Sequence, residues 1–364
     1  MVGPLTGIKV VELAGIGPGP HAAMLLADHG AEVVRVERPT AKRTLDASNR
    51  GRRVVEADLK NPADLALIRD LIDSADVLLE GFRPGVMERL GLGPEKVARS
   101  NPSLIYGRMT GWGQTGPEAH TAGHDLAYIA RTGVASLIGP DTTAAPVPPL
   151  NLVGDFGGGS MFLVFGVLAA LYEREQTGKG QIIDAAIIDG TAVLSQMFWA
   201  RHSLGAFRDV RGQNMLDGSA PFYAVYRCSD DRFMAVSAVE RPFFDIVTDT
   251  LGLPGWPEAI RLDRSRWAEL RAMLAEKFAQ HPQSHWISVF DGTDACTAPV
   301  RSMSEAPNDS QMKAREVFVE VDGITQPRPA PRFSNHGLQD PQPTARLPEP
   351  LANVVESWNT TQAV

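Results

Sequence analysis

Two glycine-flanked segments carry the residues of this 364-residue chain that are best suited to acid–base chemistry. His124 lies in Gly123-His124-Asp125, and Asp155 closely precedes the triplet Gly157–Gly159. Both are expected at helix starts, where backbone N–H groups are free and the helix dipole is positive. Histidine exchanges protons near neutral pH, and an aspartate with a reference pKa of about 3.9 is normally an ionised base. Each residue alone is most often a helix cap, but together they form a candidate acid/base pair.

The other histidines and the two cysteines give weaker signals. Residues such as His21, His29 and His285 fall in expected helices and have no special neighbours in the sequence. Cys228 and Cys296 are far apart and lack metal-ligand spacing. We therefore expect two reduced thiols, as is typical of a cytoplasmic protein, with a catalytic cysteine as the minor alternative.

A glycine-rich turn, Gly15-Ile16-Gly17-Pro18-Gly19-Pro20, is expected between a strand and a helix. Glu37 follows at about the distance at which a dinucleotide-binding fold places its ribose-binding acid. The dinucleotide fingerprint needs glycine where Pro20 stands, and two prolines remove N–H donors that would hold a pyrophosphate. A tight strand-to-helix turn without a dinucleotide is the favoured interpretation.

Basic residues follow several expected strands. They are Arg38, the turn Ala57-Asp58-Leu59-Lys60, the segment Gly81-Phe82-Arg83-Pro84-Gly85, and Arg89. Residues 35–60 hold eight basic and four acidic residues, although the whole chain has a net charge of -8. That overall charge argues against nucleic-acid binding. Isolated surface arginines are often merely solvated, but strand ends converge at one edge of a sheet, which predicts a groove for a nucleotide-like polyanion.

The first third of the chain alternates strands and helices. Strands are expected at 8–13, 31–37, 76–80 and 103–107, and helices at 20–29 and 61–73, the second with Asn61 as its N-cap. This order predicts an α/β fold with a doubly wound parallel sheet. Ligands of such sheets bind at the carboxyl ends of the strands.

The pattern changes in the middle of the chain. An apolar helix is expected at 158–173 and a strand at 180–184. The most apolar segment, Met161–Leu171, is shorter than the roughly 20 residues of a membrane span, so we expect a buried core helix and no span. Strands at 223–228 and 233–238 predict a hairpin that opens a smaller α+β domain, with helices near 242–251, 265–280 and 284–290 and a proline-rich tail at 326–350.

These segments together resemble the family III CoA-transferase superfamily and, within it, the α-methylacyl-CoA racemases. The resemblance extends over nearly the whole chain to about Arg332. The matching stretches are residues 10–20, 57–60, 81–85, 109–117, 123–125 and 148–159.

The resemblance implies a two-domain fold and an interlocked homodimer. The large doubly wound domain would comprise 1–190 and 331–364, and the small α+β domain 223–300, with linkers at 191–222 and 301–330. Acyl-CoA would be the substrate and no separate cofactor or metal would be needed. The CoA contacts would be Arg38, Ala57, Asp58, Leu59, Lys60, Gly81, Phe82, Arg83, Arg89, Gly123, His124, Asp125, Leu126, Ala127 and Tyr128.

The resemblance also implies residue roles. His124 would remove the α-proton of the S isomer and Asp155 that of the R isomer. Glu240 would orient His124, reaching it from the partner subunit, and Asn151 would support the same cluster. The backbone N–H of Asp125, at a helix start, would stabilise the enolate oxygen.

Two alternatives to a racemase remain open. Transferases of the superfamily use an aspartate at the Asp155 position as a nucleophile, and they lack a histidine at the position of His124. An inactive acyl-CoA-binding module would require the loss of an acid/base residue, and both are present.

Overall fold

The computed structural model describes residues 3–40 and 46–360. They form two compact units. The first contains the described residues of Met1–Thr132, Pro149–Ser195 and Gln311–Val364, and the second contains Gly133–Pro148 and Gln196–Ser310. Residues 133–148, expected in the large domain, thus cluster with the second unit, and residues 311–330, expected in a linker, cluster with the first.

The first unit is built around a six-stranded parallel sheet in the order β3-β2-β1-β4-β5-β6. This confirms the predicted α/β fold with a parallel sheet. From β1 the chain adds β2 and β3 on one side, and it then returns to add β4 on the other side of β1. This change of direction leaves a crevice at the carboxyl ends of β1 and β4. The strands are β1 (Lys9–Leu13), β2 (Glu32–Glu37), β3 (Arg52–Glu56), β4 (Val77–Glu80), β5 (Ile105–Thr110) and β6 (Ile182–Ala186).

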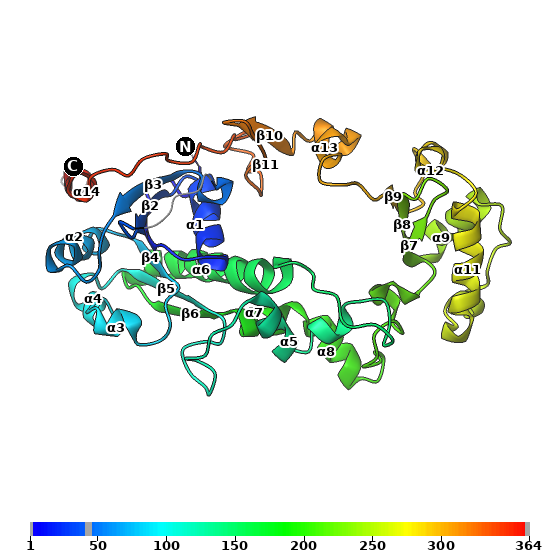
Figure 1. Cartoon of the computed structure of the whole chain (residues 1–364), viewed down its shortest axis with the longest axis horizontal. Coiled ribbons are helices and arrows are strands. Elements are labelled where there is room, and N and C mark those ends of the chain that lie inside the picture. The colour runs from blue at the N-terminus through cyan, green and yellow to red at the C-terminus, as the bar shows by residue number, and fades with distance from the viewer. Residues whose placement is uncertain (1–2, 41–45, 361–364) are drawn as a thin grey trace. The chain divides into compact units, whose positions relative to one another are not determined.

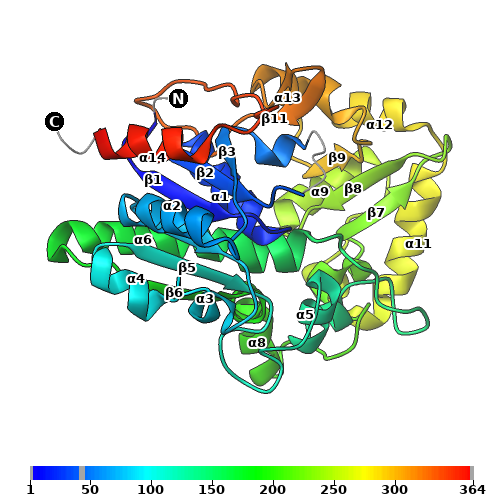
Figure 2. The ribbon, with the colours of Figure 1, turned by 60° about the vertical axis from the view of Figure 1, so that its left-hand side comes forward.

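Helices cover both faces of this sheet (Figure 2). One face packs against α2 (Pro62–Asp73), α3 (Val86–Arg89), α4 (Pro94–Ser100) and α14 (Leu351–Thr360). The other packs against α1 (Pro18–Asp28), α6 (Met161–Thr177) and α7 (Ile187–Leu194). Asn61 caps α2 as predicted, accepting a hydrogen bond of 2.9 Å from the Ala63 N–H.

Helix α14 follows the proline-rich tail and has no counterpart in the sequence analysis. Trp358 of this helix is 1% exposed in the core. Its indole N–H donates to Glu32 Oε1 at 2.7 Å, and Lys9 Nζ donates to its carbonyl at 2.9 Å. The C-terminal segment therefore completes one face of the sheet formed by the N-terminal strands.

The central apolar helix is longer than the sequence analysis expected. A π-helical segment, η3 (Leu152–Ser160), leads directly into α6, and together they form a 26-residue helix whose most apolar stretch has a mean hydropathy of 1.7. By length and composition alone it is one candidate membrane span among the described residues, but the core helix of a soluble protein has the same properties, so the expectation of no span stays a prediction. It is not a fully buried core helix, because only 33% of its most apolar window is buried.

The second unit contains an antiparallel sheet in the order β7-β8-β9, comprising β7 (Tyr223–Arg227), β8 (Phe233–Ser237) and β9 (Thr297–Pro299). The predicted hairpin is thus present. Its helices include α8 (Gln196–Ser203), α9 (Arg241–Thr250), α11 (Trp267–Phe278) and α12 (Gln283–Phe290) (Figure 1).

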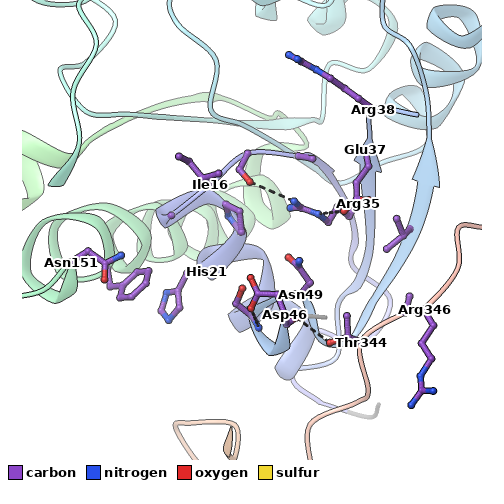
Figure 3. Close-up of a pocket in the computed structure, with 18 of the residues that line it drawn as sticks. Ile16, His21, Arg35, Glu37, Arg38, Asp46, Asn49, Asn151, Thr344 and Arg346 are labelled. Atoms are coloured by element: carbon purple, nitrogen blue, oxygen red, sulfur yellow. Dashed lines mark hydrogen bonds and ion pairs between the residues drawn. The ribbon is translucent and has the colours of Figure 1, made fainter. Parts of the chain in front are cut away.

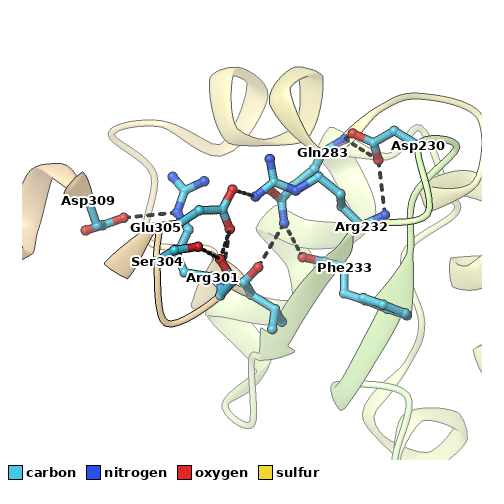
Figure 4. Close-up of polar contacts among 10 residues, drawn as sticks. Asp230, Arg232, Phe233, Gln283, Arg301, Ser304, Glu305 and Asp309 are labelled. Atoms are coloured by element: carbon cyan, nitrogen blue, oxygen red, sulfur yellow. Dashed lines mark hydrogen bonds and ion pairs between the residues drawn. The ribbon is translucent and has the colours of Figure 1, made fainter. Parts of the chain in front are cut away.

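Polar contacts connect the start of the central strand β8 with the segment after β9 and with α12 (Figure 4). Arg232 pairs with Glu305, and the Gln283 side chain donates to the Phe233 carbonyl at 2.6 Å. The β10–β11 hairpin, Phe318–Val321 and Ile324–Pro327, belongs to the first unit and lies where a linker was expected.

Candidate active site

A cavity of about 650 Å³ lies at the carboxyl ends of β1, β4 and β5. His124 and Asp155, which the sequence places 31 positions apart, both line it. The other lining residues include the turn 14–20, Gly81, Phe82, Arg83, Gly123, Tyr128 and Asn151. The structure therefore brings the predicted acid/base pair to the edge of the sheet where a ligand was expected.

His124 precedes the first residue of α5 (Asp125–Arg131) and is exposed. Its side chain makes no capping hydrogen bond, so the interpretation of His124 as a side-chain cap is wrong. As the first residue of α5, Asp125 has no intrahelical partner for its N–H, which makes that N–H available as a donor. The predicted helix start and its donor are both present.

Asp125 joins α5 to the segment that carries Asp155. Its side chain is buried, and Oδ1 accepts a hydrogen bond of 2.6 Å from the Asp155 N–H. The neighbouring Gly154 allows this approach, because a Cβ there would lie 2.3 Å from the same oxygen. The side chain of Asp125 thus connects the two predicted acid/base residues, His124 and Asp155.

Asp155 lies in the first turn of η3 and is partly buried. Burial is the largest influence and raises the pKa of its carboxyl, and the negative charge of Asp125 raises it further. A hydrogen bond from Asn151 Nδ2 to Asp155 Oδ2, 3.3 Å long, and the nearby His124 lower the pKa. The net direction is upward, which suits a group that both accepts and returns a proton. The predicted contact with Asn151 is therefore present.

The glycine-rich turn passes beside this carboxylate. Gly17 has φ of 70°, a conformation that favours glycine, and a Cβ there would lie 3.0 Å from Asp155 Oδ2. Pro18 opens α1 immediately afterwards. The turn lets the backbone approach Asp155 closely, in keeping with a tight strand-to-helix turn.

A second cavity of about 1100 Å³ shares the turn 14–17 and Asn151 with the first (Figure 3). Arg38 lines this second cavity and is exposed. In Figure 3 its side chain points away from His21. Among the expected CoA contacts, residues 57–60, Arg89 and residues 125–127 line neither cavity, although Lys60 and Arg89 are exposed.

Four of the six described basic residues in the segment 35–60 form internal ion pairs. Arg35 pairs with Glu12 and Glu37, Arg50 with Asp28, Arg52 with Glu12, and Arg53 with Glu32 and Glu349. Lys42 and Arg43 lie outside the described residues. Arg38 and Lys60 remain as the exposed basic residues of this segment in the described part of the chain.

His21 has neighbours that the sequence analysis missed. Its Nδ1 lies 2.6 Å from Ser160 Oγ, and its ring stacks on Phe156 with the centroids 4.4 Å apart. The sequence carries no local signal for these contacts, which join α1 to η3 across 139 positions.

Tyr128 and Glu240 are the two remaining expected site residues. Tyr128 is buried, and its hydroxyl donates to the Gly123 carbonyl at 2.5 Å, which ties α5 to the residue before His124. Glu240 precedes α9 in the second unit, and its side chain makes no capping hydrogen bond.

Comparison with known proteins agrees with this fold. Residues 5–353 match the model of CoA-transferase family III. The chain therefore belongs to this family.

Its relatives include members with different activities. It is 45% identical to human alpha-methylacyl-CoA racemase over 91% of this chain and 87% of that protein. It is 32% identical to the Acetobacter aceti acetyl-CoA:oxalate CoA-transferase over 95% of this chain and 93% of that protein. A CaiB/BaiF family protein from Brucella suis has a similar structure, with a TM-score of 0.83, 28% identity and coverage of 98% of this chain and 100% of that one.

Proposed function

We propose that this chain is a 2-methylacyl-CoA racemase that inverts the α-carbon by two-base proton transfer. The observation that carries the proposal is that His124 and Asp155 line one cavity and are connected through Asp125. The 45% identity to the human racemase supports it.

The reaction requires an acceptor on one face of the α-carbon and a donor on the other. Asp155 as carboxylate accepts the α-proton of the R isomer while imidazolium His124 returns a proton to the opposite face. The S isomer reacts through neutral His124 and protonated Asp155. The enolate oxygen formed in between accepts a hydrogen bond from the Asp125 N–H. No electron leaves the substrate, so the chemistry needs no redox cofactor.

Exchange in D₂O tests this proposal against the transferase alternative. The wild type should incorporate deuterium at the α-carbon of both isomers of a 2-methylacyl-CoA, followed by NMR. His124→Ala and Asp155→Ala should each abolish inversion but keep slow exchange, from the R isomer in the first and from the S isomer in the second. Transfer of CoA to a free carboxylic acid without α-deuterium uptake, with an acyl group on Asp155 trapped by hydroxylamine, would refute the racemase.

CoA is expected to bind along the carboxyl ends of the strands. Arg83 lines the reaction cavity and Arg38 the adjoining one, and both are exposed. Arg38→Ala and Arg83→Ala should raise KM and change kcat less, because phosphate contacts stabilise substrate and transition state alike. An unchanged KM in both variants would place the CoA elsewhere.

The active form is expected to be a homodimer in the cytoplasm. An apolar stripe on α6 supports the dimer: Met161, Phe165, Leu168 and Tyr172 recur at helical spacing and are 51%, 71%, 42% and 72% exposed. The free thiols Cys228 and Cys296 agree with a reducing compartment.

Subunit mixing tests the dimer and the role of Glu240. If Glu240 orients His124 of the partner subunit, co-refolding inactive His124→Ala with inactive Glu240→Ala should restore activity. An active monomer in light scattering would refute the shared site.

A further inference from the structure

The backbone around Asp155 is unusual for the support of a catalytic group. Asp155 lies in a nine-residue π-helical segment, whose hydrogen bonds are spaced more widely than those of an α-helix. Its carboxylate receives one long side-chain hydrogen bond, 3.3 Å from Asn151. Further contacts must therefore hold this turn in place.

His21 supplies two such contacts on the same turn. Its ring stacks on Phe156, the residue that follows Asp155, at a centroid distance of 4.4 Å and an interplanar angle of 28°. Its Nδ1 lies 2.6 Å from the hydroxyl of Ser160, which is completely buried. The stacking and the hydrogen bond therefore hold η3 at Phe156 and Ser160, which lie one and five residues beyond Asp155.

The hydrogen-bond directions define the form of the ring. The Ser160 hydroxyl donates to the Phe156 carbonyl at 3.1 Å, so its oxygen must accept from a proton on His21 Nδ1. Burial, followed by the charges of Arg50 and Arg52, lowers the pKa of His21 and keeps the imidazole neutral. The ring is thus a rigid donor and stacking partner held by α1.

We propose that His21 is a positioning residue for Asp155, setting the carboxylate against the α-carbon through its contacts with Phe156 and Ser160. This inference rests on the proposed racemase function. A misplacement of about 1 Å is able to cost about 10²-fold in rate. The loss should affect only the proton transfer made by Asp155, because His124 is carried by α5.

The test uses two variants that each retain one acid/base residue: His124→Ala, which retains Asp155, and Asp155→Ala, which retains His124. His21→Phe keeps an aromatic ring for stacking and removes the Nδ1 donor. Added to His124→Ala, it should slow α-deuterium exchange from the R isomer by about tenfold to 10²-fold. Added to Asp155→Ala, it should leave exchange from the S isomer unchanged. Equal slowing in both backgrounds, or none in either, would overturn the proposal.

Ser160→Ala provides an independent arm. Ser160→Ala should slow α-deuterium exchange from the R isomer and leave exchange from the S isomer unchanged. Combining it with His21→Phe should add little, because both substitutions remove the same hydrogen bond. Additive effects would overturn the coupling between these residues. If neither single-base background exchanges α-protons with solvent, the racemase function itself fails, which is distinct from failure of the His21 role.

His29→Phe is a matched control. His29 caps the other end of α1, where its Nε2 lies 3.0 Å from the Ala330 carbonyl and its ring packs edge-on against Phe333. The substitution removes the same type of group from the same helix, far along it from Asp155. Exchange from both isomers should be unchanged, and a loss equal to that of His21→Phe would overturn the positioning role.

Discussion

Gly154→Ala should separate His124 from Asp155, the proposed acid/base pair, without changing either residue. Gly154 is buried beside Asp125 and Ile129, and an added Cβ would lie 2.3 Å from Asp125 Oδ1 and 2.9 Å from Ile129 Cγ2. Because non-bonded heavy atoms pack at about 3.5 Å, the start of α5 has to move by about 1 Å relative to η3. The hydrogen bond from the Asp155 N–H to Asp125 would then stretch or break.

The expected cost is larger in catalysis than in stability. A displacement of about 1 Å between reacting groups should lower kcat by about 10²-fold. Crowding by one methyl group in a packed interior should lower the free energy of unfolding by about 1–3 kcal/mol. Inversion of each isomer followed by NMR gives kcat, and urea unfolding gives the free energy.

Gly166→Ala is the control for this prediction. Gly166 lies on α6, and the three atoms nearest to its added Cβ would all belong to the Ile183 side chain, the nearest at 3.0 Å. Its kcat should remain that of the wild type. A folded Gly154→Ala protein with the wild-type kcat for both isomers would refute the idea that Asp125 sets the spacing of His124 and Asp155.

Three further predictions concern pH, assembly and stability. The R isomer requires ionised Asp155, so kcat/KM for this isomer should fall when acid protonates the carboxylate. Because the pKa of Asp155 is raised, this fall should occur at a higher pH than for an ordinary aspartate, whose pKa is about 3.9. Asn151→Leu removes a contact that lowers this pKa, so it should move that acidic limb to still higher pH, and a downward shift would contradict the assignment. Phe165→Glu places a charge in the exposed stripe of α6 and should yield monomers in light scattering, whereas an unchanged dimer would exclude this stripe from the interface. Trp358→Ala should lower the free energy of unfolding by about 3–5 kcal/mol in urea, and a loss below about 1 kcal/mol would show that α14 is dispensable.

Local sequence signals predicted the parallel sheet and the chemistry-bearing residue types. The apolar run at 8–13 corresponds to β1, and Asn61 before Pro62 corresponds to a capped helix start. Periodicity and capping act over a few residues, so they are visible without knowledge of the rest of the chain. His124 and Asp155 were recognisable for the same reason, since each lies on its own glycine-flanked turn.

Long-range partners decided what the sequence alone left open. The basic segment at 35–60 predicted an anion site, but Arg53 pairs with Glu349 at a separation of 296 positions and Arg50 pairs with Asp28. A charge is available to a ligand only when no folded partner neutralises it, and such partners are set by packing. The sequence determined which groups are able to transfer protons. The tertiary structure decided which of them share a cavity, and it placed His21 against the turn that carries Asp155.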